Sequence, residues 1–138
     1  CRAASGKEKA VKGKNVVCIG IVGRVNSGSL DTKSHFILLD ILADLIYTGL
    51  QTVVTDANDG GETPGADWAE KRGYAVRPFA EPMPPETLGY WARRRAMKAR
   101  CRRFVEQCDC VYLIDKRGAR ARMIEKCCRR RGIWCSTN

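Results

Sequence analysis

The sequence predicts a doubly wound α/β fold, in which a parallel sheet of about five strands has the order 3-2-1-4-5 and helices cover both faces in a three-layer arrangement. Apolar runs alternate with amphipathic stretches of helical period along most of the chain. Short loops containing glycine join them, and strands that alternate with helices are typical of a parallel sheet. The 138 residues match the size of one domain and are enough to bury a core.

The first strand is expected at residues 15–22, a nearly continuous apolar run typical of a strand buried on both faces. A loop rich in Gly and Ser follows at 23–29, and a helix is expected over 31–48. The buried stripe of that helix is expected to contain Leu38, Ile41, Leu42, Leu45 and Ile46. Asp40 and Asp44 lie four residues apart and are assigned to its solvent-exposed face.

The second strand is expected at 50–55, followed by a loop of Asp, Asn and Gly at 56–62. The next helix begins at Thr63 with Pro64 in its first turn, and it ends at Gly73. In doubly wound α/β folds, nucleotide phosphates bind between the carboxyl end of a strand and the amino end of a helix. Any such connection also needs a glycine-rich turn, so the glycines alone leave both interpretations open.

The remaining elements are a strand at 74–79, a proline-rich connection at 80–85, a helix at 86–107, a strand at 110–114, a basic turn at 115–120, a helix ending near 131 and a strand at 133–135. The stripe expected to face the core in the long helix contains Met97, Cys101, Phe104, Val105 and Cys108. Trp91 either stacks on a nucleic-acid base or fills the core, and the core position is favoured. Right-handed crossovers bring the loops at 23–29, 56–62 and 115–120 to one edge of the sheet, where ligands bind in such folds.

Positive charge is concentrated in the carboxyl-terminal third of the chain. Residues 1–92 carry a formal net charge of −1, whereas residues 93–138 carry +11. Such a density is expected of a surface that meets a polyanion such as RNA, although a solvated surface that maintains solubility is the alternative. The candidate RNA contacts are Arg95, Lys98, Arg102, Arg103, Lys116, Arg117 and Arg120. Residues 1–14 are expected to be a flexible basic arm or the remnant of an organellar targeting segment.

The eight cysteines include no Cys-x-x-Cys pair. Buried, reduced thiols are therefore expected, and with them an intracellular, reducing compartment, either the cytoplasm or an organelle matrix such as that of the mitochondrion. The alternative is a zinc site built from Cys108, Cys110, Cys127 and Cys128. No apolar run is long enough to span a membrane, and no His adjoins a Ser or Cys in the three loops.

The motifs that carry a family resemblance are Gly23-Arg24 after the first strand, Gly60, Gly61 and Glu62 after the second, Trp68-Ala69 and Arg72-Gly73 in the next helix, Arg100-Cys101, Phe104 and Cys108-Asp109 in the long helix, and Gly118-Ala119 after the fourth strand. In order and spacing they resemble the YspA-like branch of the SLOG superfamily of Rossmann-like proteins, over about residues 15–135. That family pattern has Gly-Ser-Arg, then Gly-Gly-x-x-Gly-Ala-Asp, Arg-Asn-x-x-Met and Gly-Thr at these places. Here Asp56-Ala57 replaces the Gly pair, and the Ser, Asn and Thr are missing.

Members of the superfamily bind nucleotides or nucleotide-derived signals, and some cleave N-glycosidic bonds. The resemblance implies nucleotide-binding positions at Gly23, Arg24, Gly60, Gly61, Arg100, Gly118 and Ala119. It implies Glu62 as the catalytic acid beside the sugar. Asp56 is expected to place a carboxylate where phosphate oxygens would lie, and two like charges in close contact repel by about 1 kcal/mol even in water.

The expected function is therefore that of a non-catalytic SLOG-like module, at residues 15–138, whose basic third associates with RNA or a ribonucleoprotein such as an organellar ribosome. Protein partners are expected in such a particle, and the one cofactor considered is a nucleotide. The alternatives are a nucleotide-binding protein or a nucleoside-phosphate N-glycosidic hydrolase of the SLOG type. The third hypothesis is a protein–protein scaffold, whose positive charges only keep the protein in solution.

Overall fold

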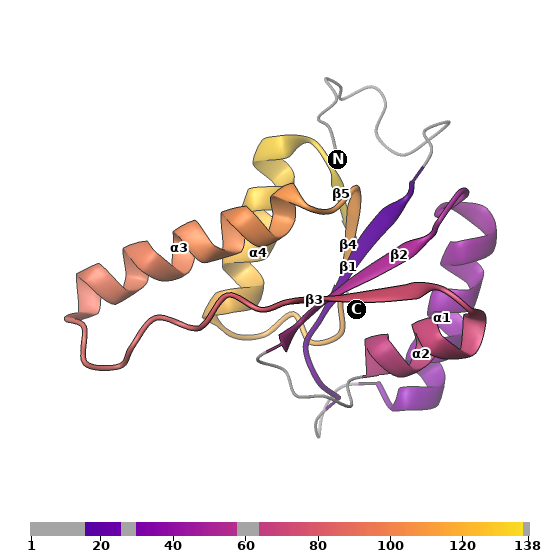
Figure 1. The fold of residues 1–138 in the computed structure, drawn as a ribbon, viewed down its shortest axis with the longest axis horizontal. Coiled ribbons are helices and arrows are strands. Elements are labelled where there is room, and N and C mark those ends of the chain that lie inside the picture. Colours follow the sequence, from indigo (N-terminus) through magenta and orange to yellow (C-terminus); the bar gives the residue numbers. More distant parts are fainter. Residues whose placement is uncertain (1–15, 26–29, 58–63, 137–138) are drawn as a thin grey trace.

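The computed structural model describes residues 16–25, 30–57 and 64–136 (Figure 1). Within them, strands and helices alternate in the order β1 (Cys18–Val22), α1 (Thr32–Leu45), β2 (Thr52–Asp56), α2 (Pro64–Arg72), β3 (Ala75–Phe79), α3 (Tyr90–Glu106), β4 (Cys110–Leu113), α4 (Ala119–Arg131) and β5 (Trp134–Ser136). All neighbouring strands are parallel, in the order β3-β2-β1-β4-β5. The predicted α/β class and strand order are confirmed, and the sheet is Rossmann-like.

The sheet lies between two helical layers, with α1 and α2 on one face and α3 and α4 on the other (Figure 1). Strand β1 is central and all five of its residues are buried, as expected of a strand covered on both sides. Ile19 and Ile21 pack in the core beneath α1 and α2. Cys18 and Val22 pack in the core beneath α3 and α4, so consecutive residues of β1 alternate between the layers.

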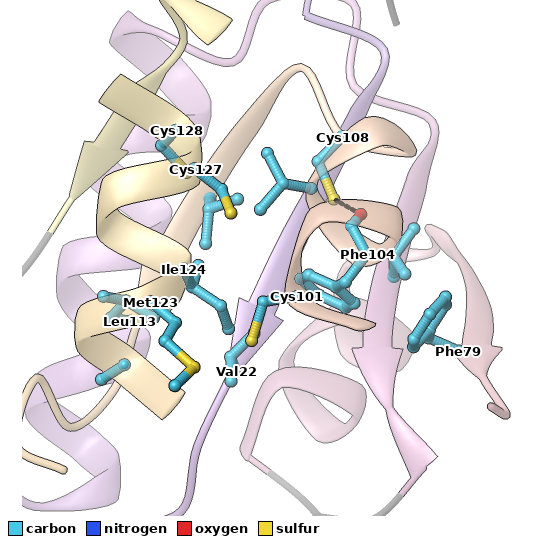
Figure 2. Packing of buried hydrophobic residues seen from close by; sticks show 14 of the residues in the cluster. Val22, Phe79, Cys101, Phe104, Cys108, Leu113, Met123, Ile124, Cys127 and Cys128 are labelled. Atoms are coloured by element: carbon cyan, nitrogen blue, oxygen red, sulfur yellow. Dashed lines mark hydrogen bonds between the residues drawn. The ribbon is translucent and has the colours of Figure 1, made fainter. Parts of the chain in front are cut away.

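The core beneath α3 contains the predicted stripe: Cys101, Phe104, Val105 and Cys108 are buried, and Met97 packs against them (Figure 2). The close approach of α3 to the sheet depends on Gly20 of β1. A Cβ atom at that position would lie 2.7 Å from the Sγ of Cys108 and 2.9 Å from the ring of Phe104. A glycine is therefore required there for steric reasons.

The predicted buried stripe of α1 is wrong in part: Leu42 and Ile46 pack half-buried against the core, whereas Ile41 and Leu45 are exposed. The buried residues of that helix are His35, Leu39 and Ala43, whereas Ile41 is 47% and Leu45 71% exposed. Apolar residues surround most of this helix, so its periodicity does not decide which side faces the sheet. The buried side has the smaller apolar surface and includes a histidine whose Nδ1 is 2.8 Å from the hydroxyl oxygen of Tyr112.

Asp40 and Asp44 lie on a solvent-accessible side of α1, as expected, and Asp40 also contacts α2. Its Oδ1 accepts hydrogen bonds from Trp68 Nε1 at 2.9 Å and from Arg72 Nη1 at 2.6 Å. Trp68 and Arg72 belong to the sequence motifs that resemble the SLOG family. In this fold they attach α2 to α1, and the hydrogen bond to Asp40 raises the pKa of Arg72.

Candidate functional site

The carboxyl ends of β1 and β4 border a cavity of about 440 Å³. The chain continues from β1 toward β2 and β3 on one side, and from β4 toward β5 on the other, so the crossovers diverge at this point. Ligands of open α/β sheets bind in the crevice at such a switch point. The residues that line this switch-point cavity are Val22, Gly23, Arg24, Met83, Asp115, Arg117, Gly118, Ala119, Arg120 and Ala121.

Two of the three predicted loops meet at the switch-point cavity. Gly23 and Gly118 both have positive φ values, of 110° and 97°, a conformation that glycine adopts without strain. They allow the chain to turn sharply after β1 and before α4, which brings Arg24 and Arg117 to the cavity wall. The Nε of Arg117 also donates to Asp115 Oδ1 at 3.0 Å, and this hydrogen bond raises the pKa of Arg117. Gly60, Gly61 and Glu62, predicted for the third loop, lie outside the described residues.

A buried ion-pair cluster adjoins the cavity. Arg100 Nη1 and Nη2 donate to the two carboxylate oxygens of Asp56, each at 2.8 Å, and Arg120 Nη1 donates to Asp56 Oδ2 at 2.8 Å. Arg100 and Asp56 are both only 2% exposed. Arg100 Nη2 also donates to the carbonyl oxygen of Glu81 at 2.7 Å, and its guanidinium lies 5.0 Å from the centre of the Phe79 ring. The hydrogen bonds to Asp56 raise the pKa of Arg100.

This cluster corrects the expectation that Asp56 presents an open carboxylate to a phosphate. Asp56 is the last residue of β2 rather than the start of the loop, and two arginines neutralise it. Arg100, matched to a family nucleotide-binding position, directs its guanidinium into the fold. The sequence contained one signal for this, because Arg100 stands four residues before Phe104 and so lies beside the buried stripe of α3.

A second cavity, of about 280 Å³, lies in the groove between α3 and α4. We call it the basic groove, because its lining contains the cations Arg94, Lys98, Arg102, Arg122, Lys126, Arg130 and Arg131, with Glu106 as its one acidic residue. Ala119, Met123 and Cys127 provide its apolar lining. Like charges gathered in this way repel each other, and an anion in the groove would relieve that repulsion.

The cations of the basic groove form two rows with helical spacing. The row on α3 consists of Arg94, Lys98 and Arg102, and the row on α4 of Arg122, Lys126 and Arg130. Residues four positions apart lie on the same side of a helix, so each row follows its helix axis. Sequence reasoning found Lys98 and Arg102 but missed the row on α4, although the same spacing was visible there.

The other predicted RNA contacts lie around the basic groove. Arg95 is exposed outside its lining, and Arg103 is exposed with its Nε 2.8 Å from Glu81 Oε2. Arg117 and Arg120 line the switch-point cavity, and Lys116 is exposed in the same turn. The groove and the cavity are adjacent, because Ala119 lines both.

The thiols in the described part of the chain form no metal ligand set. The seven cysteines in the described part of the chain are free, and all except the half-buried Cys135 are buried. Cys110 packs on the α1 and α2 side of the sheet, whereas Cys108, Cys127 and Cys128 pack on the α3 and α4 side. The four proposed zinc ligands therefore do not converge, and no group of three or more His, Cys, Asp or Glu residues within 16–25, 30–57 and 64–136 could hold a metal ion.

Comparison of the chain with protein-family models, with curated proteins and with solved structures found no match. The structure shows a Rossmann-like parallel sheet and, in its described part, the switch-point cavity and the basic groove. Among the residues that the structure describes, no helix is both long and apolar enough to cross a bilayer.

Proposed function

We propose that this protein is a non-catalytic α/β module that binds the phosphate backbone of RNA, as a subunit or accessory protein of a ribonucleoprotein. The supporting observation is the basic groove, in which seven cations and one carboxylate line the space between α3 and α4. Lys and Arg side chains supply most contacts to nucleic-acid phosphates, and a groove with cations on both sides contacts a strand laid along it from two directions.

The dimensions of the groove suit a short stretch of nucleic-acid backbone. Arg94 and Arg102 are eight residues apart on α3, which corresponds to about 12 Å along the helix axis. Several phosphates of one strand fit within such a length. The apolar lining at Met123 and Cys127 lets the aliphatic parts of the long cationic side chains pack while their charged ends reach the solvent.

The test compares two double charge reversals that change the net charge equally. Lys98→Glu with Lys126→Glu places one change on each side of the groove, whereas Lys33→Glu with Lys71→Glu changes exposed lysines on α1 and α2. Binding of a fluorescent RNA oligonucleotide is measured by anisotropy at several salt concentrations. The groove variant should bind at least tenfold more weakly with a salt slope smaller by about 2, because two phosphate contacts are lost.

The control variant should keep an affinity within about threefold of the wild type, since its lysines lie on the opposite layer of the fold. An equal loss in both variants would mean that total charge, rather than the groove, governs binding. A wild-type protein that binds no RNA at moderate salt would overturn the proposal.

The switch-point cavity favours a second candidate function, the binding of a nucleotide. Its volume of about 440 Å³ falls within the range of small-molecule sites. Arg24, Arg117 and Arg120 line it beside Asp115, so the charge of its lining is positive on balance. The SLOG resemblance supports the same ligand, with Glu62 as the acid of a hydrolase. Under this alternative, calorimetry detects binding of AMP to the wild type. Arg117→Glu weakens that binding, whereas Lys98→Glu with Lys126→Glu leaves it unchanged. If the protein also hydrolyses the nucleotide, Glu62→Gln abolishes the release of free base.

A further inference from the structure

Two aromatic residues are exposed side by side at the amino end of α3. Tyr90 and Trp91 are each 67% exposed, and their ring centres lie 4.8 Å apart at an interplanar angle of 83°. The sequence interpretation favoured a core position for Trp91, and this is wrong. The amino-terminal end of α3 extends beyond α4 (Figure 1).

The aromatic pair continues the cation row of the basic groove. Tyr90 stands four residues and Trp91 three residues before Arg94, and residues at these spacings are neighbours on a helix surface. The row from Tyr90 through Arg94 and Lys98 to Arg102 spans about 18 Å along α3. A strand that follows these cations toward the amino end of the helix therefore reaches the aromatic rings.

We propose that Tyr90 and Trp91 form a base-stacking platform at the end of the basic groove, and that the RNA bound there is single-stranded. This inference rests on the proposed function and names its substrate class. Every unpaired base offers a flat face that stacks on an aromatic ring, while the phosphates of the same strand contact Arg94 and Lys98. A duplex keeps its base faces inside the helical stack, so along its length it offers only its backbone.

The edge-to-face arrangement of the two rings supports this role. Each ring limits the movement of the other, so less side-chain freedom is lost when a base stacks on the exposed face. The neighbouring charge also favours a nucleic acid, because only Ala92 separates the aromatic pair from Arg93, Arg94 and Arg95. An apolar protein segment would gain nothing from these three cations and would have to desolvate them.

The experiment uses the full chain and three ligands of equal length: a single-stranded RNA, an abasic strand that keeps the same phosphates but lacks the bases, and the duplex of the RNA, which carries twice as many phosphates. Affinities are measured for the wild type and for Tyr90→Ala with Trp91→Ala. The single strand should bind the wild type about tenfold more tightly than the abasic strand or the duplex. The double variant should lose that advantage while its salt slope stays unchanged, because no phosphate contact is removed.

Trp91→Phe is the matched control, since it keeps a flat aromatic face. It should retain most of the single-strand preference, and it should remove the quenching of tryptophan fluorescence that the wild type shows on binding. Of the other two tryptophans, Trp68 is a buried residue of α2, and Trp134 lies on β5 at the far edge of the sheet from β3.

The outcomes separate the two proposals. Loss of binding by the groove reversals, with no effect of the double alanine variant, would overturn the stacking platform and leave the groove in place. Equal affinity of the wild type for all three ligands would overturn it as well. Failure of the wild type to bind any of them would overturn the proposed function itself.

Discussion

Arg120 Nη1 donates a 2.8 Å hydrogen bond to Asp56 Oδ2 across 64 residues of sequence. The bond joins the first turn of α4 to the last residue of β2, and β1 lies between β2 and β4 in the sheet. Asp56 also holds Arg100 of α3 through both of its oxygens. One buried carboxylate therefore fixes two helices of the α3 and α4 layer against the edge of the sheet where the switch-point cavity lies.

The first prediction concerns the unequal contributions of Arg100 and Arg120, the two partners of Asp56, to the stability of the fold. Asp56→Asn should lower the free energy of unfolding by about 3–5 kcal/mol, because it leaves the buried guanidinium of Arg100 without its counter-charge. Arg120→Gln should cost about 1 kcal/mol, since Arg120 is partly exposed and Asp56 keeps its bidentate partner. Urea denaturation followed by circular dichroism measures both. Equal losses would show that Arg100 is not the dominant partner of Asp56.

The second prediction concerns the contact between β1 and α3. Gly20→Ala should destabilise the fold by about 1–3 kcal/mol, because the added Cβ would approach Cys108 Sγ and the Phe104 ring more closely than such atoms tolerate. Gly89→Ser is the matched control. Gly89 has open space around it and precedes α3 as a cap without a side-chain hydrogen bond, so serine should be neutral or slightly stabilising. The denaturant midpoints of both variants are compared with that of the wild type. A Gly20→Ala variant as stable as the wild type would contradict the close packing of β1 against α3.

The third prediction concerns alkaline pH. Burial raises the pKa of Cys18 to about 11 and the pKa values of Cys101 and Cys110 to about 12, from 9.0. Below pH 9 these thiols are protonated in both states, so their contribution to stability is fully present. As the pH rises above 9, the unfolded chain releases protons that the folded chain retains, and stability falls until the folded thiols ionise. Each thiol should remove about 1 kcal/mol between pH 8 and pH 10.

Urea midpoints measured at pH 8, 9 and 10 with a reductant present test this dependence. Cys101→Ala should make the loss of unfolding free energy between pH 8 and pH 10 smaller by about 1 kcal/mol, the contribution of one thiol. This holds whatever the variant's stability at pH 8. A stability that is constant over this range would contradict the burial of the thiols.

The fourth prediction concerns thiol reactivity. In the folded protein at pH 8, Cys135 should be alkylated well before the buried thiols, because it is half-buried and its hydrogen bond with Cys128 lowers its pKa. In denaturant all eight thiols should react, with or without prior reduction. Mass spectrometry counts the labels, and Cys135→Ser identifies the first site. Cysteine pairs that are labelled only after reduction would be disulfides and would contradict the prediction of reduced thiols.

Local patterns determined the fold class, the strand order and the inward face of α3. The apolar run of β1, the glycines that end strands and helices, and the spacing from Cys101 to Cys108 each depend on residues close together in the sequence. For the same reason the excess of positive charge in the last third was visible from the sequence alone.

Only the tertiary structure decided which polar residues face inward and which cations share a surface. The buried face of α1 and the pairing of Asp56 with Arg100 depend on packing between segments far apart in the chain. A periodic pattern carries no information about such partners, since propensity and spacing describe one element at a time. The basic groove exists because α3 and α4 lie side by side on one face of the sheet, and Trp91 is exposed because α3 extends beyond α4.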